Sequence, residues 1–189
     1  MEDIVIVSAA RTAVGKFGGS LAKIAATELG SIVIREALAR AKVDPSLVGE
    51  VIMGQVLAAG AGQNPARQAM MKAGVAKETP ALTINAVCGS GLKAVMLAAQ
   101  AVAWGDSEIV VAGGQENITA EQKAYFESAM AGKDAALEQR VPHVYMPMLQ
   151  TAEFVSRKYN ISREAQDLYA LQSQQRTAAA QQAGRFDQE

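Results

Sequence analysis

The sequence has little of what secreted, nucleic-acid-binding or membrane-anchored proteins depend on. It contains one cysteine in 189 residues and a net charge of −1, which excludes an internal disulfide and a strongly basic surface. Its apolar N-terminal run is far shorter than the roughly 18 residues of a membrane span, and it follows acidic residues instead of a basic signal-peptide start. Half of the residues are hydrophobic, enough for one domain with a sizeable core. We therefore expect a cytoplasmic globular protein that acts on a small molecule.

Strand and helix patterns alternate over the first two-thirds of the chain, which predicts an α/β fold with a mostly parallel sheet and helices on both faces. The predicted strands are residues 4–7, 51–57, 82–86 and 108–112, and the predicted helices between them are 27–41, 65–72 and 92–104. Residues 113–147 have little periodicity and predict an irregular surface excursion with a helix at 119–130. Helices at 148–159 and 162–183 follow, and no strand comes after them, so we expect an incomplete fold.

The helix ends are marked by capping residues. Asp44-Pro45 and Asn64-Pro65 each place a capping side chain before a proline that suits the first helical position. Gly74, Gly105 and Gly184 follow predicted helices and suit the left-handed conformation that ends a helix.

The only cysteine, Cys88, lies between a predicted strand and the first turn of a predicted helix. A sharp strand-to-helix turn exposes the side chain at its apex, and the unpaired amides of the helix start face it. Gly89 and Gly91 would let a large ligand approach the backbone. These features favour a reactive thiol, although an inert buried cysteine is the alternative.

A nucleophilic thiol needs more activation than a helix start provides, because that effect is only about 0.3–1 kcal/mol. The usual activator is a histidine acting as a base. His143 is the only histidine, and it lies in the irregular stretch between Pro142 and Pro147 with nothing to bring it near Cys88. We interpret it as a solvent-exposed loop residue and expect the base to be absent from this chain.

Several motifs identify a resemblance to the thiolase family. NAVCGSGLKAV at residues 85–95 resembles the acylated-cysteine motif, and SAARTAVGKFGG at 8–19 resembles the N-terminal signature. GQNPARQA at 62–69 is similar to the stretch at the thiolase dimer contact, and GGQEN at 113–117 is similar to a strand end of the family. TAE at 151–153 and ISRE at 161–164 resemble helices of the same domain. The resemblance covers nearly the whole chain.

The resemblance implies the N-terminal half of a thiolase, with residues 1–112 and 148–189 forming the α/β core, residues 113–147 a loop region inserted in it, and the C-terminal half absent. Cys88 would be the nucleophile that carries the acyl group as a thioester, with its backbone amide in the oxyanion hole. Coenzyme A would be a substrate, and the resemblance implies no cofactor and no metal. The expected role is acetyl-CoA C-acetyltransferase or 3-ketoacyl-CoA thiolase in fatty acid metabolism.

Other positions follow from the same resemblance. Met148 would be a wall of the acyl pocket, with Gly89 and Gly91 also lining the substrate site. Gln63, Asn64 and Arg67 would lie at the interface of a homodimer or homotetramer. Glu116, at a strand end, is interpreted as structural, with a supporting role beside the substrate site as the alternative.

The resemblance also leaves alternatives open. In thiolases a GHP histidine and a CxGxG cysteine lie in the C-terminal half, so this chain could act only with a separate C-terminal half, or be a noncatalytic truncated domain. A β-ketoacyl synthase also acylates a cysteine at a helix start, but the VCGSG stretch favours a thiolase. A cysteine hydrolase is disfavoured because no histidine and acid are arranged with Cys88.

Overall fold

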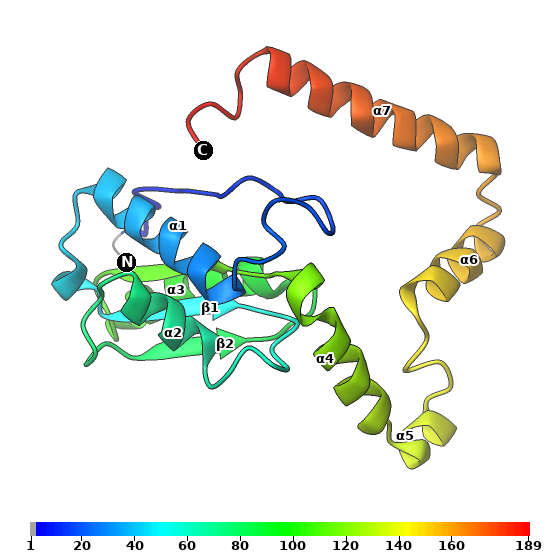
Figure 1. Cartoon of the computed structure of the whole chain (residues 1–189), viewed down its shortest axis with the longest axis horizontal. Helices are drawn as coiled ribbons and strands as arrows, with labels where there is room; N and C mark the ends of the chain where they lie inside the picture. The colour runs from blue at the N-terminus through cyan, green and yellow to red at the C-terminus, as the bar shows by residue number, and fades with distance from the viewer. Residues whose placement is uncertain (1–2) are drawn as a thin grey trace. The chain divides into compact units, whose positions relative to one another are not determined.

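The structure is a computed structural model that describes residues 3–189 (Figure 1). The chain divides into two compact units, the first reaching Met130 and the second Ala131–Glu189. The boundary falls inside a helix that starts in the first unit. The predicted insertion of residues 113–147 into a core of 1–112 and 148–189 therefore stays a prediction.

The first unit contains a parallel three-stranded sheet. Its strands are β1 (Glu50–Gly54), β2 (Ala81–Ile84) and β3 (Val110–Gly114), in the spatial order β2-β1-β3. The register pairs Val51 with Ala81 on one side and with Val111 on the other. The predicted parallel α/β fold is confirmed, although the three predicted strands at 51–57, 82–86 and 108–112 differ from the observed ones by a few residues at their ends.

Helices cover both faces of the sheet. Val51 and Met53 of β1 join the core cluster with Ile34 of α1 (Ala26–Ala41) and Met70 of α2 (Pro65–Lys72). Successive side chains of a strand point to opposite faces, so Ile52 faces the other side. That side is covered by α3 (Ser90–Trp104), which packs against β1 and β3. The central strand is therefore buried on both faces, as its apolar sequence predicts.

The predicted helix signals are confirmed at several ends. Asn64 accepts the N–H of Arg67 with its side chain at the start of α2, and Asp44 accepts the N–H of Ser46 before the short 3-10 helix η1 (Pro45–Leu47). Gly105 adopts a φ of 79° after α3. An 18-residue stretch, Val87–Trp104, is long and apolar enough to cross a membrane, a property that core helices of globular proteins share.

The predicted strand at residues 4–7 is wrong. Val5, Ile6 and Val7 are 69%, 78% and 70% exposed, and the segment belongs to no strand in the part of the chain that the structure describes. Their β-branched side chains favour extended backbone, but a strand also needs a hydrogen-bonding neighbour, and the observed three-stranded sheet does not include this segment. Local preference alone therefore does not make this segment a strand.

The remaining helices follow the sheet. They are α4 (Ile118–Ala131), which spans the unit boundary, and α5 (Ala135–Arg140), α6 (Met148–Lys158) and α7 (Arg163–Gln182) in the second unit. The sequence prediction missed α5, which Asp134 caps by accepting the N–H groups of Ala136 and Leu137. The predicted helices 119–130, 148–159 and 162–183 are confirmed within one or two residues at their ends.

Candidate functional site

Cys88 occupies an exposed turn between the end of β2 and the start of α3. Only a few residues separate Ile84, the last residue of β2, from Ser90, the first residue of α3. The strand–turn–helix arrangement predicted around the cysteine is therefore present. We call residues 85–90 the elbow.

Hydrogen bonds inside the elbow define its shape. Gly89 donates its N–H to the Ala86 carbonyl at 3.1 Å, and Ser90 donates its N–H to the Val87 carbonyl at 3.0 Å. Val87 has a φ of 51°, in the left-handed region that β-branched residues avoid. The amide N–H of Cys88 has no acceptor among the described residues. The elbow thus exposes both the thiol and an uncommitted N–H donor of Cys88.

Close glycine contacts seat the start of α3 on the sheet. A Cβ added to Gly54, the last residue of β1, would lie 2.6 Å from Cβ of Ser90 and 2.9 Å from N of Gly91. At Gly114, the last residue of β3, an added Cβ would lie 3.6 Å from Cα of Gly91. The cysteine turn therefore lies at the carboxyl ends of the strands, the edge where ligands of open α/β sheets bind.

The helix start also favours an anion at this edge. The first turn of α3 contains no acidic residue that would oppose its positive end. Such a helix end stabilises a nearby negative charge by about 0.3–1 kcal/mol. A Cβ added to Gly91 would meet nothing within 4 Å, whereas at Gly89 it would lie 3.4 Å from the Ala86 carbonyl oxygen. An added Cβ therefore has more room at Gly91 than at Gly89.

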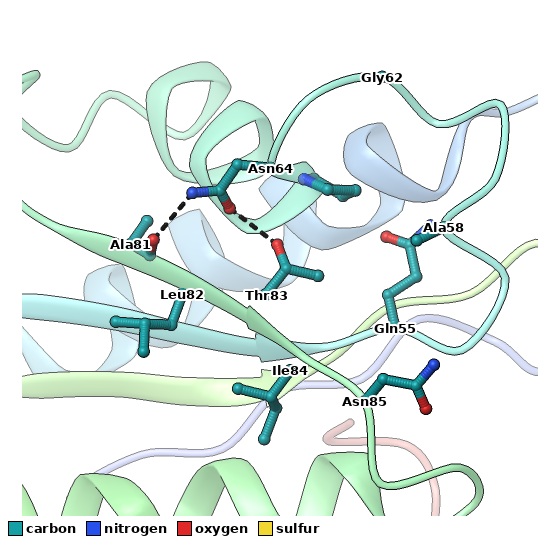
Figure 2. Close-up of a pocket in the computed structure, with 10 residues that line it drawn as sticks. Gln55, Ala58, Gly62, Asn64, Ala81, Leu82, Thr83, Ile84 and Asn85 are labelled. Carbon is teal, nitrogen blue, oxygen red and sulfur yellow. Dashed lines mark hydrogen bonds between the residues drawn. The ribbon is translucent and has the colours of Figure 1, made fainter.

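A cavity of about 530 Å³ lies beside β2 and the loop before α2 (Figure 2). Asn64 lines this cavity and is hydrogen-bonded to β2. Its Nδ2 donates to the Ala81 carbonyl at 2.9 Å, and its Oδ1 accepts from the Thr83 hydroxyl at 2.8 Å. Gln55 and Asn85 lie at the end of the cavity nearest the elbow, and Asn85 belongs to both (Figure 2). The cavity thus adjoins the turn that carries the cysteine.

The three residues predicted at an interface have contacts within the chain. Asn64 caps α2 in a left-handed conformation with a φ of 42°. The guanidinium group of Arg67 donates to the carbonyls of Thr79 and Lys77, and the carbonyl of Gln63 accepts from Gln68. Their role at a subunit interface stays a prediction.

A polar cluster that includes Gln55 of the cavity lies where β1 and β3 end. Gln55 donates to the Glu121 carboxylate at 3.2 Å and accepts from the Gln115 amide at 2.9 Å. Both carboxylate oxygens of Glu116 accept backbone N–H groups, from Val56 at 2.9 Å and from Leu57 at 3.1 Å. This clamp supports the structural interpretation of Glu116.

Glu121 is the member of this cluster with an unusual charge state. It is 9% exposed, and burial, followed by repulsion from Glu116, raises its pKa from 4.5 to about 7, against the hydrogen bond from Gln55. Sequence reasoning missed this group because it treated residues 119–130 only as a helix. A glutamate in the first turn of a helix is ordinarily exposed and charged.

Two further residues discussed from the sequence lie in the second unit. His143 is exposed in a turn with a φ of 72°, as its interpretation as a solvent-exposed loop residue predicts, and Met148 is 77% exposed as the first residue of α6. Neither is placed relative to Cys88, so the pocket role of Met148 stays a prediction. Among the described residues, no group of three or more His, Cys, Asp or Glu side chains could hold a metal ion.

Fold and site together define a class of protein. It is an α/β protein with an exposed cysteine on a strand-to-helix elbow at the carboxyl edge of a parallel sheet, an arrangement suited to a covalent nucleophile. The family model described as "Thiolase, N-terminal domain" matches residues 4–189, so the chain belongs to the thiolase family.

The chain is also similar to curated thiolase relatives. It is 58% identical over 198 residues to the acetyl-CoA acetyltransferase of Cupriavidus necator, a match that covers 100% of this chain and 50% of the relative. It is 49% identical over 197 residues to the cytosolic acetyl-CoA acetyltransferase of Rattus norvegicus, covering 100% of this chain and 49% of that protein. The chain therefore spans about half the length of the curated relatives it matches.

Proposed function

We propose that this chain supplies the acyl-carrying cysteine of an acyl-CoA C-acyltransferase that condenses acetyl-CoA with an acyl-CoA, or cleaves a 3-ketoacyl-CoA with coenzyme A. The observation that carries the proposal is the exposed Cys88 on its elbow, in a chain whose relatives are named acetyl-CoA acetyltransferase. Coenzyme A is a substrate, and the chemistry requires no cofactor or metal.

The elbow supports the first half of such a reaction. The thiolate of Cys88 attacks the thioester carbonyl of an acyl-CoA, and the backbone N–H of Cys88 is free to donate to the oxygen that becomes negative. Collapse of the tetrahedral intermediate breaks the bond to the coenzyme A sulfur, which leaves with a proton. The acyl group then remains on Cys88 as a thioester until a second coenzyme A species accepts it.

The proton transfers need a base that the elbow does not contain. The side chains that bond within the elbow are those of Asn85 and Ser90, and neither accepts a proton near neutral pH. A second candidate function is therefore a half-enzyme that acts only with a separate C-terminal half, with a noncatalytic domain as the remaining alternative.

Exposed apolar side chains favour the half-enzyme. Three of them lie on α3, the helix that begins at the cysteine turn. Leu92 is 71% exposed, Met96 49% and Trp104 84%. Large exposed apolar surfaces commonly mark interaction sites. We include in this proposal a cytoplasmic location, a role in fatty acid metabolism and a homodimer or homotetramer as the complete form.

Thiolysis of acetoacetyl-CoA by the purified chain, with Cys88→Ala as control, tests the proposal. Turnover that depends on Cys88 supports a catalyst that is active alone. Absent turnover, but an acetyl adduct on Cys88 or activity restored by a thiolase C-terminal half, supports the half-enzyme. Retained turnover in Cys88→Ala, or no Cys88 acylation even with the C-terminal half, contradicts the mechanism.

A further inference from the structure

The backbone of Val87, the residue before the cysteine, is held in an unfavourable conformation. Its φ of 51° lies in the left-handed region, where the Cβ of an L-residue approaches the following carbonyl oxygen. For a β-branched residue this conformation is an outlier, and it persists only where neighbouring groups impose it.

Two polar side chains hold both ends of this residue. Asn85 accepts the N–H of Val87 on its Oδ1 at 2.9 Å. Ser90 donates its hydroxyl to the Val87 carbonyl at 2.6 Å, and the same hydroxyl oxygen accepts the N–H of Ala86 at 2.9 Å. Together with the backbone N–H of Ser90, these bonds satisfy the polar groups of residue 87 in its left-handed conformation.

Ser90 is well placed to impose this geometry. It is 4% exposed and packs against Gly54 at the end of the buried central strand. A hydroxyl has one proton to donate and lone pairs to accept, and both functions are used inside the elbow. Asn85 is exposed and bonds the N–H of Val87. The carbonyl of Val87 is therefore held by a serine packed on the core, and its N–H by an asparagine in a short local turn.

We propose that Asn85 and Ser90 are positioning residues for Cys88: by holding Val87 left-handed, they turn the chain so that the thiol and the unbonded N–H of Cys88 are presented together. In an ordinary extended or helical conformation of Val87, the following peptide group rotates and this N–H takes another direction. The catalytic part of this inference rests on the proposed acyl transfer, whereas the conformational part does not.

The conformation of residue 87 is measured first, by NMR of the full chain, from the coupling between the amide and α protons that reports φ. We expect Asn85→Ala and Ser90→Ala each to move Val87 out of the left-handed region. The Asn85 side chain bonds the Val87 N–H, whereas the Ser90 side chain bonds the Val87 carbonyl, so the two variants remove different bonds. Asn85→Asp keeps the acceptor oxygen and should keep the conformation. Ser31→Ala removes an equally buried serine hydroxyl from α1 and is the matched control.

The rate of Cys88 acetylation by acetyl-CoA is measured second, by mass spectrometry of the intact chain, with a C-terminal thiolase half added if the chain alone is not acetylated. We expect Asn85→Ala to slow acetylation at least about tenfold. Adding Val87→Gly should restore the rate to within about twofold, because glycine adopts the left-handed conformation without a side-chain clash. Loss of a merely stabilising bond would not be rescued in this way.

The outcomes separate the two proposals. A left-handed Val87 in both alanine variants, or an acetylation rate in Asn85→Ala equal to that of the unsubstituted chain, overturns the positioning role. If the unsubstituted chain is never acetylated, the proposed function fails while the NMR result still decides what holds the elbow.

Discussion

Removing the charge of Glu121 should stabilise the protein at alkaline pH and leave it unchanged at acidic pH. Its pKa is 4.5 without the fold and about 7 within it, because burial and Glu116 disfavour the carboxylate. The folded state therefore holds a proton between these values that the unfolded state has lost. The contribution of this proton to the free energy of unfolding is fully present below about pH 4.5, decreases as the pH rises, and is lost above about pH 7.

The size of the effect follows from the same values. Each pKa unit corresponds to about 1.4 kcal/mol, so the change from 4.5 to about 7 corresponds to at most about 3–4 kcal/mol. The residue is not completely buried, at 9% exposed, and solvent screening reduces the effect, so we expect about 2 kcal/mol. Glu121→Gln keeps an oxygen that can accept from Gln55 and removes the charge that Glu116 repels. Above pH 7 this variant should exceed the unsubstituted protein by that amount.

Urea unfolding at several pH values between about 5 and 8 measures the difference. The control is Glu127→Gln, on the same helix, whose side chain is 68% exposed and pairs with Lys123 at 4.0 Å. It should follow the unsubstituted protein at every pH. A stability gap for Glu121→Gln that is the same at pH 5 and pH 8 would refute the reasoning, since the gap would then not arise from a titrating carboxylate.

Two further substitutions test how the site is built. Gly54→Ala should destabilise the protein by about 1–3 kcal/mol in urea unfolding, because the new Cβ would lie 2.6 Å from Cβ of Ser90, whereas Gly113→Ala meets only Met53 at 3.7 Å and should be tolerated. Glu116→Ala should lower the midpoint of unfolding by an amount that corresponds to about 2–3 kcal/mol, since two backbone amides lose a charged acceptor. Equal stability of the two glycine variants, or a neutral Glu116→Ala, would contradict these contacts.

Local sequence signals predicted the helices well because the relevant interactions span only a few residues. Asn64-Pro65 marks the start of α2 by a side-chain bond within one turn, and Gly105 ends α3 with a left-handed residue. The position of Cys88 between a strand and a helix follows from the same reasoning. Such short-range features can be predicted without knowing the rest of the fold.

Features that depend on distant partners could not be predicted in this way. The β-branched residues from Ile4 to Val7 indicate a strand, yet strand formation depends on a neighbour that the segment itself does not encode. The raised pKa of Glu121 depends first on burial by the fold and then on repulsion from Glu116, and Gln55, whose hydrogen bond opposes the shift, is 66 residues away in sequence. The left-handed Val87 contradicts the preference of its own side chain, so its conformation follows from the bonds around it.

The elbow and the polar cluster are attached to the same strand in different ways. Gly54, the last residue of β1, packs directly against the start of α3, so the most buried strand of the sheet fixes the position of the cysteine turn. Glu116 and Glu121 bond the residues that come after this strand, and the hydrogen bond that joins those residues to the elbow, from Asn85 to the Val56 carbonyl, is long at 3.4 Å. A hydrogen bond of that length is weak. The charge of Glu121 should therefore affect how α4 and the loop before α2 are held, while the geometry at Cys88 depends on Gly54 and the clamp around Val87.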